Sequence, residues 1–251
     1  MSLDWLNRSE MLLGEDTVQK LQQCRVCIIG LGGVGSYATE ALVRAGIGRF
    51  VLIDFDEVGI TNLNRQIIAL QSTLGQAKTE VMKERILAIN PEAEVTCHQV
   101  FLDKENRHIF LQDCDYYIDA IDSLGPKIGL LEYAIRNGLK IITVMGAGNR
   151  MDPSQIKLGS LNQSINCPLA RRARKALRRN GLKPDIPAVY STELPLLPTP
   201  NEDDSLDELI LKRGRQRQPI GSISYMPAIM GMVAASWIVR TLASVSCTGA
   251  R

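Results

Sequence analysis

The stretch CRVCIIGLGGVGS (residues 24–36) decides the fold. Its first half is a β-branched apolar run, typical of a buried strand, and it leads directly into Gly30, Gly32, Gly33 and Gly35. A G-x-G-x-x-G pattern between a strand and a helix is typical of a nucleotide-phosphate loop, because backbone N–H groups can approach phosphate oxygens where side chains are missing. A tight turn without a ligand would also use glycines. The stretch predicts a strand, a phosphate-binding loop and a helix in succession.

Outward from this loop, strand-like runs alternate with helix-like runs over the first 150 residues. The predicted strands are residues 24–30, 49–55, 94–100, 115–119 and 140–144, and the predicted helices are residues 34–45, 77–89, 105–112 and 127–137. Such alternation builds a parallel sheet covered by helices. We therefore expect an α/β fold: a Rossmann-like, doubly wound, mostly parallel sheet with helices on both faces, plus a C-terminal elaboration.

The character of the chain changes after residue 150. Seven prolines interrupt residues 151–200, and charges separate into a basic block at 171–183, an acidic block at 202–208 and a second basic block at 212–217. We expect residues 1–150 to form a nucleotide-binding core. Residues 151–251 are expected to add a basic helix and an apolar C-terminal helix that pack on this core within one domain overall.

Composition excludes several classes of protein. With 251 residues, 45% hydrophobic and 22% charged, the chain can bury a full core without disulfides or metals. The net charge of +2 gives no general attraction to nucleic acid, so such binding would depend on a local cluster. Residues 1–14 mix charged and apolar side chains and do not resemble a cleavable signal, which favours a cytoplasmic location.

Two short features have more than one interpretation. Cys24 and Cys27 form a C-x-x-C, as in a redox pair or half of a zinc site. Strand residues i and i+3 point to opposite faces, however, so we expect buried cysteines and no structural zinc.

The apolar residues 226–239 are too few to span a bilayer. A buried or subunit-interface helix is therefore favoured over membrane association.

Charged residues follow the predicted strand ends, where parallel sheets bind ligands. Asp54 lies 19 residues after Gly35 and can accept hydrogen bonds from the ribose hydroxyls of either NAD or ATP. Arg65 and Lys78 supply the positive charge that a triphosphate requires, and Asp122 can hold a magnesium ion. An NAD-dependent dehydrogenase needs none of these three charges, so the pattern favours ATP.

Five motifs together resemble the adenylating family of ubiquitin-activating enzymes and bacterial activators of sulfur-carrier proteins. They are Gly-Leu-Gly-Gly-Val-Gly-Ser at 30–36, Asp-x-Asp at 54–56, Asn-x-Asn-Arg-Gln at 62–66, Gly-Gln-Ala-Lys at 75–78 and Asp-Ala-Ile-Asp at 119–122. The spacings of 11 residues from Asp54 to Arg65 and 13 from Arg65 to Lys78 match the family pattern. This resemblance covers residues 5–150 and implies that residues 1–150 form an ATP-binding adenylation core.

The resemblance implies a role for each site residue. Asp54 would bind ribose, Asn62 and Arg65 would bind phosphates, Lys78 would act on the phosphates at the reaction centre, and Asp122 would hold Mg²⁺. Arg65, Lys78 and Asp122 are the implied catalytic residues. The full implied nucleotide site is Arg8, Gly30, Gly32, Gly33, Gly35, Asp54, Asp56, Asn62, Arg65, Lys78 and Asp122.

Two further features of the chain bear on its partners. Arg8 resembles an arginine that reaches the ATP site of a neighbouring subunit, which implies a homodimer.

The zinc-binding cysteine pairs of the carrier-protein activators are absent from the sequence, and Cys167 is the only cysteine in the region of their loop thiol. Residues 146–153, 167–170 and 190–193 instead resemble the branch that dehydrates threonylcarbamoyladenosine in tRNA.

That branch implies a ligase-type reaction with ATP. The carboxylate of the modified nucleoside would be adenylated and then closed to a ring, with tRNA as the macromolecular substrate. The implied RNA-binding residues are Arg171, Arg172, Arg174, Arg178 and Arg179, although a merely solvated helix face would carry the same charges. A monovalent cation (Na⁺ or K⁺) and a sulfur-transfer partner protein stay open. The alternative function is an adenylating activator of a ubiquitin-like sulfur-carrier protein.

Overall fold

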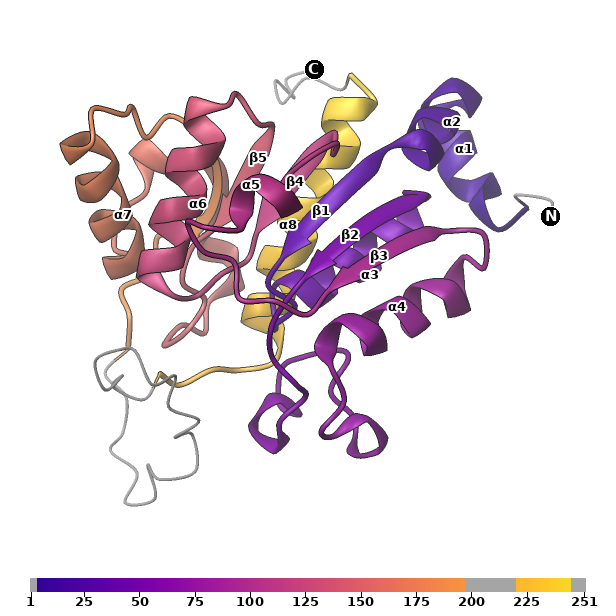
Figure 1. The fold of residues 1–251 in the computed structure, drawn as a ribbon, viewed down its shortest axis with the longest axis horizontal. Helices are drawn as coiled ribbons and strands as arrows, with labels where there is room; N and C mark the ends of the chain where they lie inside the picture. The colour runs from indigo at the N-terminus through magenta and orange to yellow at the C-terminus, as the bar shows by residue number, and fades with distance from the viewer. Residues whose placement is uncertain (1–3, 197–219, 245–251) are drawn as a thin grey trace.

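One seven-stranded sheet forms the centre of the protein (Figure 1). The computed structural model describes residues 4–196 and 220–244. In the order β3-β2-β1-β4-β5-β7-β6, neighbouring strands are parallel except for the antiparallel edge pair β6 and β7. The strands are β1 (Arg25–Ile29), β2 (Arg49–Ile53), β3 (Glu94–His98), β4 (Tyr116–Asp119), β5 (Ile141–Val144), β6 (Ile156–Ser160) and β7 (Pro187–Ser191). The order reverses between β1 and β4, which confirms the predicted doubly wound, mostly parallel sheet.

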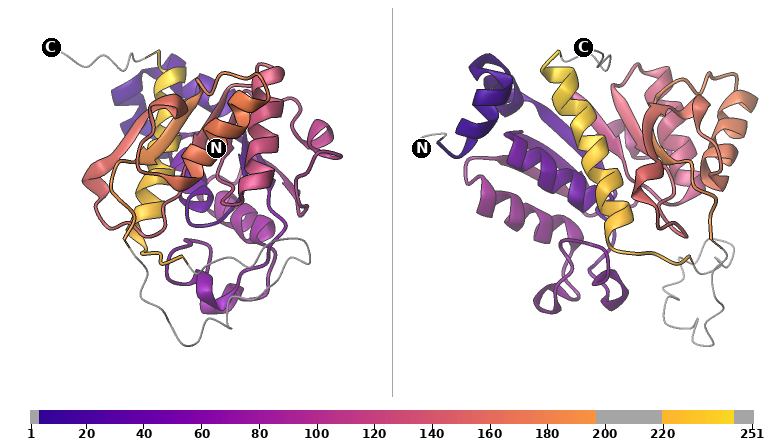
Figure 2. Two further views of the ribbon diagram at one scale, coloured as in Figure 1. Left: turned by 90° about the vertical axis from the view of Figure 1, so that its left-hand side faces the viewer. Right: turned by 180° about the vertical axis from the view of Figure 1, so that it is seen from behind.

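Helices cover both faces of the sheet (Figure 2). One face packs against α3 (Gly35–Ala45), α4 (Lys78–Ile89) and α8 (Tyr225–Leu242), and the other against α5 (Arg107–Phe110), α6 (Leu124–Arg136) and α7 (Pro168–Arg179). The central strand β1 is apolar on both faces because successive side chains alternate between two buried layers. Val26 and Ile28 lie in the layer under α3 and α8, whereas Cys27 and Ile29 lie in the layer under α6.

The predicted buried cysteines are confirmed. Cys24 and Cys27 are free thiols with 4% and 0% of their surface exposed, and they lie in opposite core layers. Burial raises the pKa of the Cys24 thiol to about 12, so it stays a neutral core side chain at physiological pH.

The second half of the chain extends the same sheet. The strands β6 and β7, which were not predicted, continue the sheet beyond β5, so residues on both sides of residue 150 share it. Helix α8 packs closely on α3, since a Cβ atom at Gly231 would lie 2.3 Å from the carbonyl oxygen of Val34. By length and composition α8 could cross a membrane, and 44% of it is buried inside the protein. The acidic block and the second basic block lie outside the described residues.

The N-terminal segment is helical, although no helix is predicted before residue 24. Helices α1 (Asn7–Leu13) and α2 (Glu15–Gln23) precede β1. Figure 1 shows them at the N-terminal end of this strand. Val18 and Leu21 of α2 are buried, so this helix covers one end of the core.

Helix α5 is shorter than the predicted helix 105–112 and spans four residues.

Candidate active site

The glycine loop joins the end of β1 to the start of α3, as predicted. Gly30 has a φ of +91°, and a Cβ atom there would lie 2.9 Å from the carbonyl oxygen of Ala120. A Cβ atom at Gly35 would lie 1.8 Å from the carbonyl oxygen of Gly30. The loop therefore folds tightly on itself and against the segment that follows β4, which only glycine permits.

The glycine loop presents backbone N–H groups at the start of α3. The N–H groups of Gly32, Gly33 and Val34 find no acceptor among the residues that the structure describes, and α3 has no side-chain cap. Helix N-termini carry partial positive charge, and unpaired N–H groups there bind anions. This cradle therefore fits a phosphate group.

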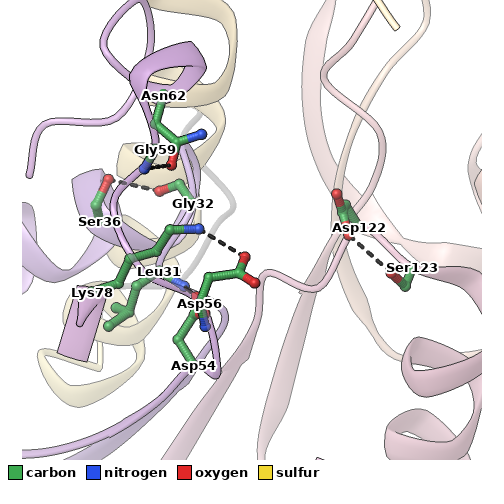
Figure 3. A network of polar contacts seen from close by, with 10 residues as sticks. All are labelled: Leu31, Gly32, Ser36, Asp54, Asp56, Gly59, Asn62, Lys78, Asp122 and Ser123. Carbon is green, nitrogen blue, oxygen red and sulfur yellow. Dashed lines mark hydrogen bonds and ion pairs between the residues drawn. The ribbon is translucent and has the colours of Figure 1, made fainter. Parts of the chain in front are cut away.

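Asp54 follows β2, and its carboxylate accepts a hydrogen bond from the glycine loop (Figure 3). Its Oδ2 accepts a hydrogen bond from the Leu31 N–H at 2.5 Å, and its Oδ1 accepts one from the Asp56 N–H at 2.9 Å. Burial raises the pKa of the Asp54 carboxyl, against the lowering effects of Lys78 and of these two backbone donors. Asp54 thus shapes the loop, and the predicted contact with ribose stays a prediction.

Lys78 and Asp56 form an ion pair beside the loop. Lys78 begins α4 and is 5% exposed, and its Nζ lies 2.9 Å from Oδ2 of Asp56 (Figure 3). The Asp56 side chain is 45% exposed, so solvent reaches the pair from that side. The Lys78 N–H also donates to the carbonyl oxygen of Asp56 at 3.1 Å, which fixes the start of α4 against the segment after β2.

Asn62 and Arg65 lie on the loop between β2 and α4. The Asn62 Oδ1 accepts a hydrogen bond from the Gly59 N–H at 3.1 Å. The Arg65 Nη1 donates to the carbonyl oxygen of Thr61 at 2.7 Å. A Cβ atom at Gly33 would lie 3.2 Å from the carbonyl oxygen of Arg65, so this segment adjoins the glycine loop.

The two remaining residues of the implied nucleotide site lie on other parts of the fold. Asp122 is exposed on the loop between β4 and α6, where its Oδ1 accepts a hydrogen bond from the Ser123 hydroxyl at 3.1 Å. Figure 3 shows Asp122 across the site from Lys78 and Asp56. Arg8 is an exposed residue of α1, and Figure 1 shows this helix at the opposite end of β1 from the glycine loop, which joins β1 to α3. The structure therefore does not bring Arg8 to the other site residues of its own chain.

The basic helix is α7, and its arginines differ in their surroundings. Arg171, Arg172 and Arg179 are exposed, and no hydrogen bond or ion pair engages their side chains within the described part of the chain. Arg178 is also exposed but donates to the Asn162 side chain. Arg174 is half-buried and donates to the Ser164 carbonyl oxygen at 2.6 Å, so it holds the preceding loop in place.

Sequence reasoning missed three buried polar side chains near the site. Lys127 is 0% exposed, and Arg150, at 3%, donates to the carbonyl oxygens of Gly146, Asn166 and Glu193. Gln66 is 6% exposed, and its Oε1 has no partner among the described residues.

A sequence signal for Lys127 existed. It lies three, four and seven residues before Leu130, Leu131 and Ala134, the buried side chains of α6, so it occupies the apolar stripe of that helix. A charged residue in such a position needs a buried partner.

A doubly wound sheet with an anion-binding loop at the point where the strand order reverses defines a nucleotide-binding α/β protein. The chain belongs to the ThiF family, and the sequence model of that family matches residues 6–250. Over 241 residues it is 34% identical to the tRNA threonylcarbamoyladenosine dehydratase of Bacillus subtilis, covering 96% of this chain and 95% of that protein.

A solved structure agrees with this relationship. The crystal structure of the Escherichia coli tRNA N6-threonylcarbamoyladenosine dehydratase in complex with ATP superposes with a TM-score of 0.84 at 36% identity, covering 99% of each chain. The similarity to the E. coli molybdopterin-synthase adenylyltransferase is 34% over 155 residues and covers 58% of this chain and 59% of that protein. Similarity to the dehydratases therefore extends through the second half of the chain.

Proposed function

We propose that this protein is an ATP-dependent tRNA threonylcarbamoyladenosine dehydratase. It would adenylate the carboxylate of the threonylcarbamoyl group and then close that group to a ring. The observation that carries the proposal is the set of N–H groups at Gly32, Gly33 and Val34, which have no acceptor among the described residues and lie beside the buried Lys78 (Figure 3), in a chain that matches dehydratases over at least 96% of its length. ATP binding by a close relative of the same fold supports it.

The first step needs positive charge around phosphate. A carboxylate oxygen attacks the α-phosphorus of ATP, and the bond to pyrophosphate breaks to leave an acyl adenylate. The N–H groups of the glycine loop bind phosphate oxygens, and Lys78 and Arg65 stabilise the negative charge that grows on the leaving group. Asp122 would hold Mg²⁺, which supplies further positive charge when bound.

The second step needs no protein thiol. An atom of the same nucleoside attacks the adenylated carbonyl and AMP leaves, so proximity within one substrate replaces a thioester intermediate. Cys167 supports this reading, because it is 6% exposed and its Sγ accepts a hydrogen bond from the Ala170 N–H at the start of α7. That thiol acts as a helix cap.

The partners belong to the proposal as well. The exposed arginines of α7 would bind the tRNA backbone. Arg8 would complete the ATP site of a second subunit in a homodimer, since its helix α1 lies at the other end of β1 from the glycine loop of its own chain (Figure 1). We place the enzyme in the cytoplasm, where tRNA is modified and where the free thiols of the core stay reduced. The monovalent cation and the sulfur-transfer partner stay predictions.

A second candidate function is activation of a ubiquitin-like sulfur-carrier protein. The similarity to the molybdopterin-synthase adenylyltransferase supports this second candidate. That similarity extends over 155 residues. Such an enzyme would adenylate the C-terminal carboxylate of its carrier with the same core residues. The two functions therefore differ in their substrates and share the phosphate chemistry.

Nucleoside analysis of tRNA tests the proposal. Purified protein is incubated with MgATP and tRNA that carries threonylcarbamoyladenosine, and the digested nucleosides are identified by mass spectrometry. We expect the modified nucleoside to be replaced by a species one water lighter, with one AMP and one pyrophosphate formed per turnover. Reactions without ATP are the control. An unchanged nucleoside, together with adenylation of a carrier protein, would replace this proposal with the second candidate.

A further inference from the structure

A buried ion pair lies beneath the loop that carries Asp122. Lys127 and Asp119 are both 0% exposed, and Nζ of Lys127 lies 2.7 Å from Oδ2 of Asp119. The same ammonium group donates to Oγ1 of Thr143 at 3.2 Å and to the carbonyl oxygen of Val144 at 3.0 Å. The Thr143 hydroxyl donates in turn to Oδ2 of Asp119 at 2.6 Å. The three N–H groups of the ammonium thus have three acceptors.

The network joins three elements at the edge of the sheet where the site lies. Asp119 is the last residue of β4, Thr143 lies in β5, and Lys127 lies in the first turn of α6. The second oxygen of Asp119, Oδ1, accepts a hydrogen bond from the Ile121 N–H at 3.1 Å. This bond fixes the first turn of the segment from β4 to α6, in which Asp122 is the next residue.

The same segment forms a wall of the phosphate loop. A Cβ atom at Gly30 would lie 2.9 Å from the carbonyl oxygen of Ala120, and one at Gly35 would lie 3.3 Å from the Ala120 Cβ. A shift in the segment would therefore change its distance from the glycine loop as well as the place of Asp122. Two hydrogen bonds hold the start of this segment: the Ile121 N–H donates to the Asp119 side chain, and the Ala120 N–H donates to the carbonyl oxygen of Ile29 at 2.9 Å.

Stability alone is a weak reason for such a pair. Removing two charges from water is costly, and apolar side chains of similar volume often stabilise a core equally well. We propose that the Asp119–Lys127–Thr143 network positions Asp122 for the adenylation step. Asp119 and Lys127 are positioning residues, because they act through the Ile121 N–H. This inference rests on the proposed function, in which Asp122 holds Mg²⁺.

Two double variants separate positioning from stability. Asp119→Asn with Lys127→Met removes both charges and keeps a side-chain oxygen for the Ile121 N–H. Asp119→Leu with Lys127→Met removes both charges and that oxygen. Thermal denaturation first establishes that each variant is folded at the assay temperature. Pyrophosphate release then gives kcat, the KM for ATP and the Mg²⁺ concentration for half-maximal rate, and calorimetry without Mg²⁺ gives AMP affinity.

We expect the leucine variant to have a kcat roughly 10- to 100-fold below that of the asparagine variant, the range typical of residues that orient a metal ligand. It should also need more Mg²⁺ for half-maximal rate, while the two variants bind AMP with equal affinity. A purely structural network would change the unfolding temperature and leave kcat and the Mg²⁺ requirement the same in both variants, which would overturn the inference.

A single substitution covers the case in which a double variant does not fold. Thr143→Val keeps both charges and removes one hydrogen bond to Asp119, so we expect a lower kcat with unchanged AMP affinity. An unchanged kcat in that variant would overturn the inference. Failure of the wild-type protein to release pyrophosphate with modified tRNA would instead overturn the proposed function.

Discussion

Lys78 combines burial with a partner that solvent can reach. Its ammonium is paired with Asp56 at 2.9 Å, and the Lys78 side chain is 6% exposed against 45% for Asp56. The long apolar stem is therefore fixed in the protein, while the charged end lies at the rim of the site. This geometry suits a group that meets negative charge as it develops on a phosphate.

Lys78→Ala tests that role. We expect kcat to fall roughly 100-fold or more, the typical cost of removing one donor to a developing charge. The KM for ATP should rise by a smaller factor, because the charge that Lys78 faces is greatest in the transition state. Initial rates of pyrophosphate release over a range of ATP concentrations measure both quantities.

Lys83→Ala is the matched control on the same helix. Lys83 is 40% exposed, and its Nζ lies 3.9 Å from Glu80, so its removal should leave both constants unchanged. An increase in KM at constant kcat for Lys78→Ala would assign Lys78 to uniform binding of ATP.

Helices α3 and α4, which begin at the site, are connected by a charged bridge. Glu40 of α3 accepts hydrogen bonds from Arg85 of α4 at 2.6 Å and from Arg44 at 2.7 Å. Burial alone would raise the pKa of Glu40, but the hydrogen bonds from Arg85 and Arg44 outweigh it and lower the pKa below its ordinary value. The bridge joins the middle of α3 to the second half of α4, the two helices that begin at the glycine loop and at Lys78.

Glu40→Gln is therefore expected to destabilise the fold in a pH-dependent way. A carboxyl with a lowered pKa in the folded state stabilises the protein above its ordinary pKa and loses that contribution as pH falls through the lowered value. We expect a loss of about 1–2 kcal/mol in the free energy of unfolding at pH 7, discounted for the exposure of both arginines. The loss should shrink as pH falls below 4.5, the ordinary value.

Urea denaturation at several pH values measures this loss. Glu80→Gln is the control, since the exposed pair of Glu80 with Lys83 should contribute little at any pH. A destabilisation by Glu40→Gln that does not change with pH would show that packing, and not charge, explains the effect.

Helix α7 has one face that holds the protein and another that is open to a partner. Arg174 holds the Ser164 segment, whereas Arg171, Arg172 and Arg179 are exposed. Changing these three arginines to glutamine should weaken tRNA binding. It should also reduce the slope of log affinity against log salt by roughly 0.9 per lost phosphate contact on duplex-like RNA, by analogy with B-DNA.

Fluorescence anisotropy at several salt concentrations measures both effects. A variant with Lys20, Lys104 and Lys157 changed to glutamine loses the same charge from exposed positions on other elements. If the two triple variants bind tRNA equally, the basic face of α7 is only solvated. ATP binding should be unchanged in both.

At the scale of the whole molecule, α1 has the properties of an interface. Met11 and Leu12 are 76% and 82% exposed on the same short helix as Arg8. Arg8 lies away from the active site of its own chain, and exposed apolar side chains lie on the same helix. Both features favour contact between α1 and a second copy of the chain.

Mixing two inactive variants tests the homodimer. We expect an Arg8→Ala chain and a Lys78→Ala chain to regain activity together, because the heterodimer contains one site with both residues intact. Activity assays on mixtures that have exchanged subunits, with sedimentation equilibrium for the mass, check this. Each variant mixed with itself is the control. A fully active monomer, or no recovery after exchange, would contradict a shared site.

Much of the fold could be predicted because its signals are local. The apolar run before Gly30 and the glycines themselves predicted β1, the loop and α3, and the runs that end at Asp54 and Asp119 predicted β2 and β4. The strands β6 and β7 gave no such signal. Pro187 opens β7, and Lys157 and Ser160 interrupt the apolar residues of β6, so these strands depend on pairing with β5 and with each other.

The sequence by itself determined the fold class, the phosphate loop and the identity of the charged residues at the strand ends. Residue type and spacing are enough for this, since strand ends of a parallel sheet meet at one edge. Only the tertiary structure decided that Arg174 is engaged within the fold, that Lys127 pairs with Asp119, and that α1, the helix of Arg8, lies away from the glycine loop of its own chain. Those outcomes depend on how elements distant in the chain pack, and packing follows from the shape and burial of many side chains together.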